Sequence, residues 1–185
     1  DDDLEAALRR RERVRQRRLH RRYVVAMHGT QPAHADTAQH CTAAVRMIFA
    51  NLQRAHDDGN DLAAREAMAI AAFYAGLAFP KAYVGYVHAF SHKIGGMYGV
   101  PHGLANAITL PYVLDFLLDS PRARDGLAEL AVVIGAGSAG EPQDLLARRF
   151  VERVRELNRG VGIPDKMAPL KAADVPEIAR AAMIE

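Results

Sequence analysis

The sequence predicts an all-α, helical bundle-like domain with no substantial β-sheet. Half of its 185 residues are hydrophobic, alanine is prominent among them and tryptophan is absent. Such a composition suits closely packed helices better than a sheet of β-branched residues. Apolar residues recur at intervals of three and four in several segments, and no segment between turn signals alternates with a period of two. The length is sufficient for one hydrophobic core.

Two helices are expected in the first half of the chain, joined by a turn that contains glycine. The first is predicted over about residues 36–55, from apolar side chains that share one face. These side chains are Val45, Ile48, Phe49 and Leu52. Asn60 or Asp61 can cap the second helix, over residues 62–79, and Pro80 is expected to stop it. The many small residues of this second helix indicate that it is buried between neighbours.

Five more helices are expected over about residues 83–94, 101–119, 122–134, 141–160 and 174–185. The first of these five is expected to end at Gly95–Gly96. Pro101 suits the first turn of the next, which is expected to bend at Pro111. The helix over residues 141–160 has the clearest apolar face, formed by Leu146, Phe150, Val154 and Leu157.

Residues 1–22 form an arginine-rich head, which we treat as distinct from a helical domain over residues 23–185. The head has nine arginines against five acids, which leaves 15 basic and 17 acidic residues for the rest of the chain. A solvated helix is the simplest interpretation of the head. Arginine tracts can also neutralise phosphates, but no aromatic residues or folded reader module accompany them. Nucleic acid is therefore not expected as a partner, although salt-sensitive binding of nucleic acid by the head stays open as a hypothesis.

The cysteine content and the hydropathy of the chain indicate its cellular location. A single cysteine, Cys41, rules out an internal disulfide and fits a reducing compartment, so a cytoplasmic protein is expected. No apolar run approaches the length of a membrane span, and no signal peptide is readable. No membrane partner is expected.

The stretch GAGSAG, residues 135–140, matches the GxGxxG fingerprint of dinucleotide-binding proteins. That fingerprint requires a strand before it, a helix after it and an acidic residue on a second strand about twenty residues later. Here that distance leads into NRGVG after a long amphipathic helix, with no second strand. A loop between two helices is the better interpretation.

Three histidines lie close together in the stretch HAFSHKIGGMYGVPHG. His88 and His92 are four residues apart, so both rings project from one face of a helix. The glycines that follow let the chain turn back, so that His102, at the start of another helix, can lie against His88. Neutral imidazoles suit divalent zinc or iron, but a catalytic metal usually takes at least three protein ligands.

The run AGLAF-x8-HAFSHKIGGMYGVPHGLANAITLPYVLDF resembles the signature of the iron-containing (group III) alcohol dehydrogenases. The similarity covers about residues 23–185 and implies the dehydroquinate synthase-like α domain of that family. It implies that His88 and His102 bind the catalytic metal, Fe²⁺ or Zn²⁺. It also implies that His92 takes part in proton transfer beside the nicotinamide, and that Phe79 lines the same cofactor pocket.

The resemblance further implies an NAD(P)-dependent oxidoreductase acting on a small alcohol or aldehyde. In such chemistry the metal polarises the alcohol oxygen for hydride transfer to the nicotinamide. The family's α/β cofactor domain, however, has no counterpart in this sequence. NAD(P) could therefore act only through that missing domain.

The sequence also departs from the family at the two remaining metal ligands. The family's DAxxHAxE pattern is expected near residues 14–21, where this chain reads VRQRRLHR, and His20 is out of step with it. Asp36 and His40 have the i, i+4 spacing of a ligand pair, but they match a later part of the family, in which Asp36 opens a helix. Two hypotheses therefore stay open: the metal-binding part of a dehydrogenase, or an inactive fragment or degenerate copy that serves as a structural or dimerisation module.

Overall fold

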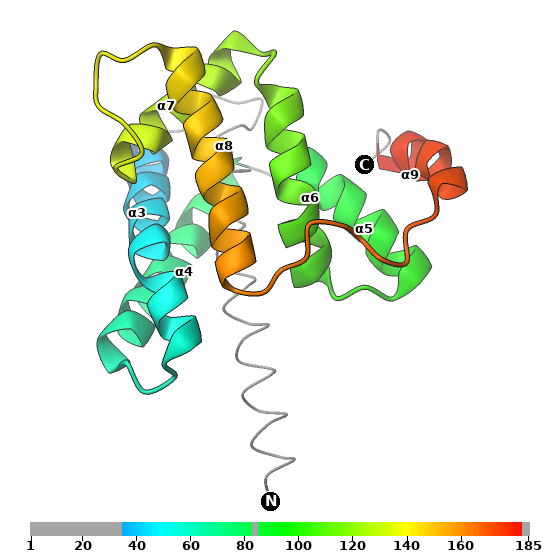
Figure 1. The fold of residues 1–185 in the computed structure, drawn as a ribbon, viewed down its shortest axis with the longest axis horizontal. Coiled ribbons are helices and arrows are strands. Elements are labelled where there is room, and N and C mark those ends of the chain that lie inside the picture. The colour runs from blue at the N-terminus through cyan, green and yellow to red at the C-terminus, as the bar shows by residue number, and fades with distance from the viewer. Residues whose placement is uncertain (1–34, 83–84, 183–185) are drawn as a thin grey trace, which may run out of the picture.

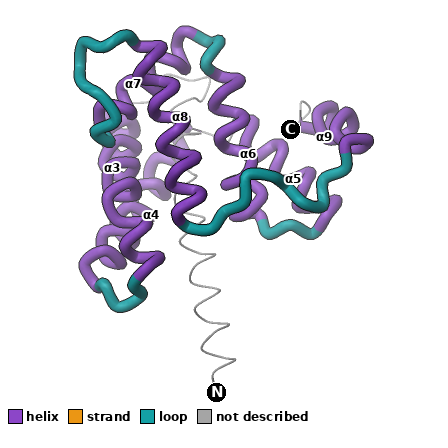
Figure 2. The backbone as a smooth tube through the Cα atoms, in the orientation of Figure 1, coloured by secondary structure: helices purple, strands orange, loops and turns teal. Residues whose placement is uncertain are grey.

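The computed structural model describes residues 35–82 and 85–182, and within them the chain is built of helices and loops without a strand (Figure 2). The elements are α3 (Ala35–Asp57), α4 (Leu62–Ala82), α5 (Tyr86–Tyr98), α6 (His102–Leu117), α7 (Pro121–Val133), α8 (Gln143–Gly160), the 3-10 helix η1 (Ala172–Asp174) and α9 (Val175–Ala182). The prediction of an all-α fold is confirmed. The arginine-rich head and its boundary at residue 22 lie outside the described residues.

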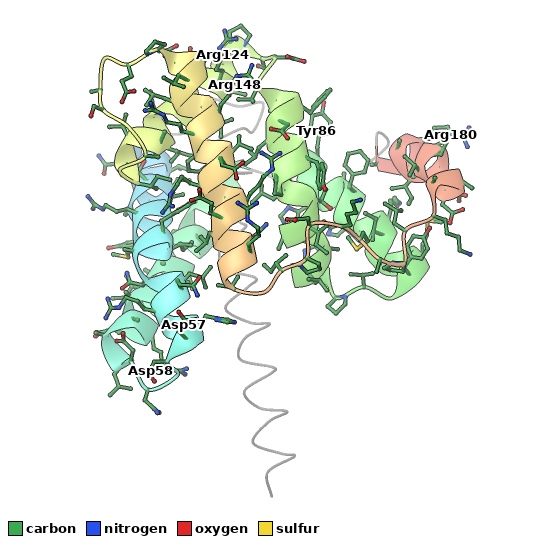
Figure 3. The ribbon with its side chains drawn as sticks, viewed as in Figure 1. Asp57, Asp58, Tyr86, Arg124, Arg148 and Arg180 are labelled. Carbon is green, nitrogen blue, oxygen red and sulfur yellow. The ribbon has the colours of Figure 1, made fainter. Side chains whose placement is uncertain are left out.

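The helices pack as antiparallel neighbours around one main core. The hairpin of α3 and α4 lies beside the hairpin of α7 and α8, and α6 joins α8 to α5 (Figure 1). The helix α9 packs against α5 at the far side of the molecule. Charged side chains lie at both ends of the α3–α8 group, with Arg124 and Arg148 at one end and Asp57 and Asp58 at the other (Figure 3).

The apolar faces predicted from the sequence form the core. All four residues of the predicted face of α8 are buried, and Phe150 is fully buried with its ring 5.6 Å from that of Phe49 on α3. Among the described elements the nearly uniformly apolar α4 packs mainly against α3, so the expected burial between several neighbours is not seen there. Its other side leaves Phe73 63% exposed. The turn before α4 is capped as expected, because the carboxylate of Asp61 accepts a hydrogen bond of 2.9 Å from the main-chain N–H of Ala64.

Two predicted helix ends are wrong. The helix α4 continues through Pro80 to Ala82. Proline removes one main-chain donor, but it does not prevent the following residues from being helical. The helix α5 likewise continues through Gly95 and Gly96 and ends at Gly99, whose φ of 65° is left-handed and whose N–H donates to the carbonyl of Gly95. A helix stops where a residue adopts this cap, and not at the first glycine.

The stretch GAGSAG is a loop between α7 and α8, and the apolar residues before it are the end of α7 rather than a strand. The prediction of a loop between two helices is confirmed. None of the helices that the structure describes is long and apolar enough to cross a membrane.

Candidate functional site

The three histidines are brought together by the α5–α6 hairpin. His88 and His92 lie one turn apart on α5, and His102 is the first residue of α6. The two helices pack against each other, and the left-handed cap at Gly99 reverses the chain between them. The convergence predicted from the glycines and the spacing of the histidines is therefore present.

The imidazole rings form a compact triangle. The ring centres of His88 and His102 are 5.2 Å apart, those of His92 and His102 are 5.1 Å apart, and those of His88 and His92 are 5.9 Å apart. Imidazoles that share one ion, with nitrogen–metal distances of about 2.0–2.2 Å, have ring centres about 5 Å apart. The spacing between His88 and His102 is compatible with a shared cation.

The cluster has an inner and an outer part. His88 is only 5% exposed, whereas His92 and His102 are exposed residues. Among the described residues, His92 and His102 thus form the exposed side of the cluster and His88 forms its buried side. The ring centres lie within 6 Å of one another, which leaves no room for a hydrophobic side chain between the rings.

The described residues do not form a complete set of metal ligands. Within residues 35–82 and 85–182, no group of three or more histidine, cysteine, aspartate or glutamate side chains is arranged to hold a metal ion. The stretch over residues 14–21, where the family's other two ligands are expected, lies outside the described residues, as does His20. The imidazoles fit Fe²⁺ or Zn²⁺ by their chemistry, but the ligand set is incomplete in this part of the chain.

The other predicted site residues are placed as follows. Phe79 lies near the end of α4, but its side chain is outside the described residues. Asp36 is in the first turn of α3 and is likewise described only in its main chain. His40 stacks on Tyr74 of α4 with ring centres 5.4 Å apart, so this imidazole has a packing partner within the α3–α4 hairpin.

One residue of the cluster was missed by the sequence reasoning. Asn106 lies one turn after His102 on α6, is 3% exposed, and places its Nδ2 atom 2.8 Å from Nε2 of His102. The available signal was the i, i+4 spacing, which puts the two side chains on the same face of a helix. The same spacing places His88 and His92 on one face of α5.

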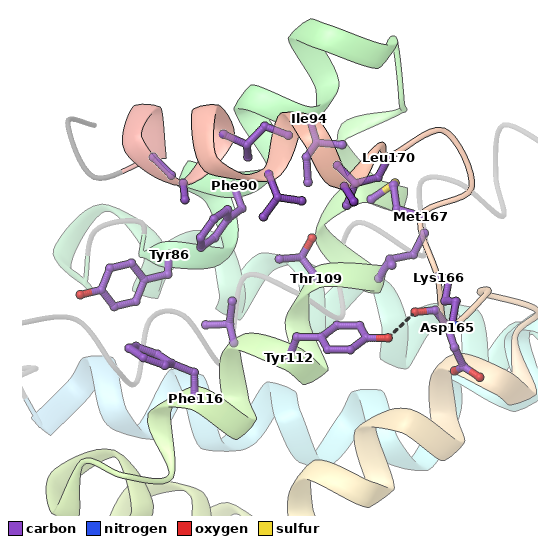
Figure 4. Close-up of a pocket in the computed structure, with 17 residues that line it drawn as sticks. Tyr86, Phe90, Ile94, Thr109, Tyr112, Phe116, Asp165, Lys166, Met167 and Leu170 are labelled. Carbon is purple, nitrogen blue, oxygen red and sulfur yellow. Dashed lines mark hydrogen bonds between the residues drawn. The ribbon is translucent and has the colours of Figure 1, made fainter.

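A separate apolar pocket of about 860 Å³ lies between α6 and the segment that leads into α9 (Figure 4). Tyr86 and Phe116 flank one end, and at the other end the hydroxyl of Tyr112 donates a 2.8 Å hydrogen bond to the main-chain carbonyl of Asp165. Tyr86, Phe90 and Ile94 line it from α5, and none of the three histidines contributes to its wall. The pocket is therefore distinct from the histidine cluster.

Comparison with protein families matches residues 28–185 to the model of the Fe-containing alcohol dehydrogenase family, C-terminal. Among curated proteins, the chain is similar to 1,3-propanediol dehydrogenase of Klebsiella pneumoniae, with 38% identity over 143 residues that cover 76% of this chain and 36% of that protein. It is also similar to alcohol dehydrogenase 4 of Saccharomyces cerevisiae, with 38% identity over 141 residues that cover 75% of this chain and 35% of that protein.

Solved structures give the same result for the fold. A crystal structure of 1,3-propanediol oxidoreductase matches with a TM-score of 0.85 and 33% identity, over 90% of this chain and 44% of that chain. An alcohol dehydrogenase from Oenococcus oeni matches with a TM-score of 0.85 and 30% identity, over 90% of this chain and 43% of that chain. The chain therefore spans less than half the length of the relatives that it matches.

Proposed function

Because residues 28–185 belong to the iron-containing alcohol dehydrogenase family, as its C-terminal helical part, we propose that this chain is the metal-binding part of an NAD(P)-dependent alcohol dehydrogenase or carbonyl reductase. The observation that carries the proposal is the triangle of imidazoles at the α5–α6 hairpin. The substrate would be a small alcohol or aldehyde. The nicotinamide cofactor would be bound mainly by a part of the relatives that this chain does not span.

In this proposal His88 and His102 hold a divalent ion, Fe²⁺ or Zn²⁺. When bound, such an ion supplies a Lewis acid that lowers the pKa of a substrate alcohol. The buried position of His88 gives the site a fixed inner ligand, and the position of His102 at the start of α6 leaves its ring accessible from outside. Phe79 is proposed to line the nicotinamide pocket.

His92 is proposed to move the substrate proton. Its ring is exposed and lies beside that of His102, so it can contact both a substrate held at the cluster and the surrounding water. Histidine is the side chain most often used for general acid–base catalysis. His92 is also proposed to contact the nicotinamide.

The alternative is that the chain is an inactive fragment or degenerate copy that serves only as a structural or dimerisation module. The incomplete ligand set of the described residues favours it. Two large apolar side chains, Phe73 on α4 and Phe116 on α6, are 63% and 67% exposed and could contribute to an interface between two copies. Sedimentation velocity across a range of concentrations would detect such a homodimer.

Metal loading separates the two functions. The chain is loaded anaerobically with Fe²⁺ or Zn²⁺, desalted, and analysed for metal per chain. We expect close to one ion per chain, and a loss of most of it in His88→Ala and in His102→Gln. His56→Ala is the matched control, because His56 lies at the end of α3 beside Asp57 and away from the cluster.

The metal-binding function would be refuted by negligible metal in the unmodified chain, or by equal metal content in all four proteins. Far-UV circular dichroism of each variant checks that the helices are intact, so that a loss of metal is not a loss of fold. Activity toward alcohols does not serve as the test, because it also requires the nicotinamide-binding part.

A further inference from the structure

Asn106 contacts the histidine cluster from the protein interior. It lies on α6 between the buried residues Ala105 and Ala107 and is itself 3% exposed. Its Nδ2 atom is 2.8 Å from Nε2 of His102, whereas its Oδ1 atom is buried without a hydrogen-bond partner among the described residues. This buried amide therefore makes its side-chain hydrogen bond to His102.

The chemistry of the two groups gives the contact a direction. The amide nitrogen of asparagine can only donate, so Nε2 of His102 must accept. A ring nitrogen that accepts carries a lone pair and no proton. The proton of the neutral imidazole is then on Nδ1, and the hydrogen bond selects this tautomer over the other.

We propose that Asn106 is a positioning residue, which fixes the ring of His102 against the cluster and keeps its Nε2 atom unprotonated. The geometry that points to this role is the buried position of the amide at i+4 on the same helix as the ring it contacts. Asn106 does not need to contact a substrate or a metal to do so. It acts through His102.

The consequence for cation binding rests on the proposed function. A divalent ion binds only an unprotonated ring nitrogen. The amide N–H and a cation would then compete for the same lone pair on Nε2. The amide holds the ring in a form ready to coordinate, and a cation that binds through Nε2 must displace the amide.

The tautomer is measured by ¹⁵N NMR of the metal-free chain labelled at histidine, at about pH 8, where an unperturbed imidazole is neutral. The signals of His102 are assigned from their loss in His102→Gln. In the unmodified chain we expect the proton on Nδ1. In Asn106→Asp, which has the same shape but a carboxylate that can only accept, we expect a proton on Nε2.

Two further variants test whether the effect is specific. Asn106→Ala removes the amide donor, so the fraction of His102 rings with the proton on Nδ1 should fall. Asn51→Ala is the matched control, because Asn51 is a partly buried helical asparagine that donates to the carbonyl of Met47 on α3. This control should leave the His102 signals unchanged. A proton on Nε2 in the unmodified chain, or the same tautomer in the unmodified chain and in Asn106→Asp, overturns the proposal.

Titration with Zn²⁺ tests the displacement. The side-chain amide signal of Asn106 and the ring signal of His102 should shift over the same range of zinc concentration. A shift of the ring with an unchanged amide signal would overturn the displacement. If zinc does not bind, the proposed metal-binding function fails, while the tautomer measurement still decides the role of Asn106.

Discussion

Removing the side chain of Asn158 should destabilise the protein, because it leaves one buried main-chain oxygen, that of Ala107, without a hydrogen bond. Pro111 lies inside α6 and has no N–H, so the carbonyl of Ala107, four residues earlier, lacks its normal helical partner. Asn158 on α8 is 4% exposed and donates its Nδ2 to this carbonyl at 2.8 Å. A side chain 51 positions away therefore supplies the hydrogen bond that the proline removes.

The magnitude follows from what Asn158→Ala leaves behind. The carbonyl of Ala107 becomes a buried acceptor without a partner, which costs about 1–3 kcal/mol. Truncating a buried side chain adds a packing loss, while removing the Oδ1 atom of Asn158, which is buried without a partner in the described part of the chain, offsets some of it. We expect a net loss of about 2 kcal/mol in the free energy of unfolding.

A double-mutant cycle with Pro111→Ala isolates this effect. Alanine at position 111 restores an N–H that can bond to the carbonyl of Ala107, so Asn158→Ala should then cost at least about 1 kcal/mol less. The free energies of the four proteins are measured by urea unfolding, with tyrosine fluorescence and circular dichroism as two probes of one transition. Equal costs of Asn158→Ala in both backgrounds would refute the argument.

Three other regions give predictions of their own. The hydrogen bond from the N–H of Ala64 lowers the pKa of the Asp61 carboxyl group below its usual 3.8. The ionised carboxylate therefore stabilises the folded chain fully above pH 3.8, and this stabilisation is lost as the pH falls through the lowered pKa. In Asp61→Asn the urea midpoint of unfolding should therefore decrease less as the pH is lowered into the acid range. Burial raises the pKa of Cys41 to about 11. Iodoacetamide at about pH 8 should modify it at least about 100-fold more slowly in the folded chain than in urea. Tyr98 donates to the carboxylate of Asp174, so Tyr98→Phe should speed limited proteolysis just before α9 without changing the urea midpoint of the core.

The sequence was a good guide to the helices because their signals are local. Apolar residues at intervals of three and four located α3 and α8 to within a few residues of their observed bounds. The two wrong ends, at Pro80 and at Gly95–Gly96, were read from residue type alone. The observed ends depend on the conformation that a residue adopts, as at Gly99, and residue type does not determine that conformation.

The same distinction applies to the candidate site. The pair His88 and His92 was predictable from helical spacing, and the approach of His102 followed from the glycines between the helices. The contact of Asn106 with His102 could not be predicted in this way, because it depends on α6 turning the asparagine side chain inward against the ring. The two further ligands that the resemblance leads us to expect near residues 14–21 fall outside the described residues, so the ligand set stays incomplete within the described part of the chain.

The position of the site also depends on a contact that no local pattern reveals. His102 and Asn106 occupy the first two turns of α6, and Pro111 follows in the same helix. A helix that lacks an internal hydrogen bond can bend at that point unless another group holds it. The hydrogen bond from Asn158 attaches α6 to α8 one residue after Asn106, at Ala107. The direction in which α6 presents His102 to α5 is therefore set partly by α8, although α8 contributes no residue to the histidine cluster.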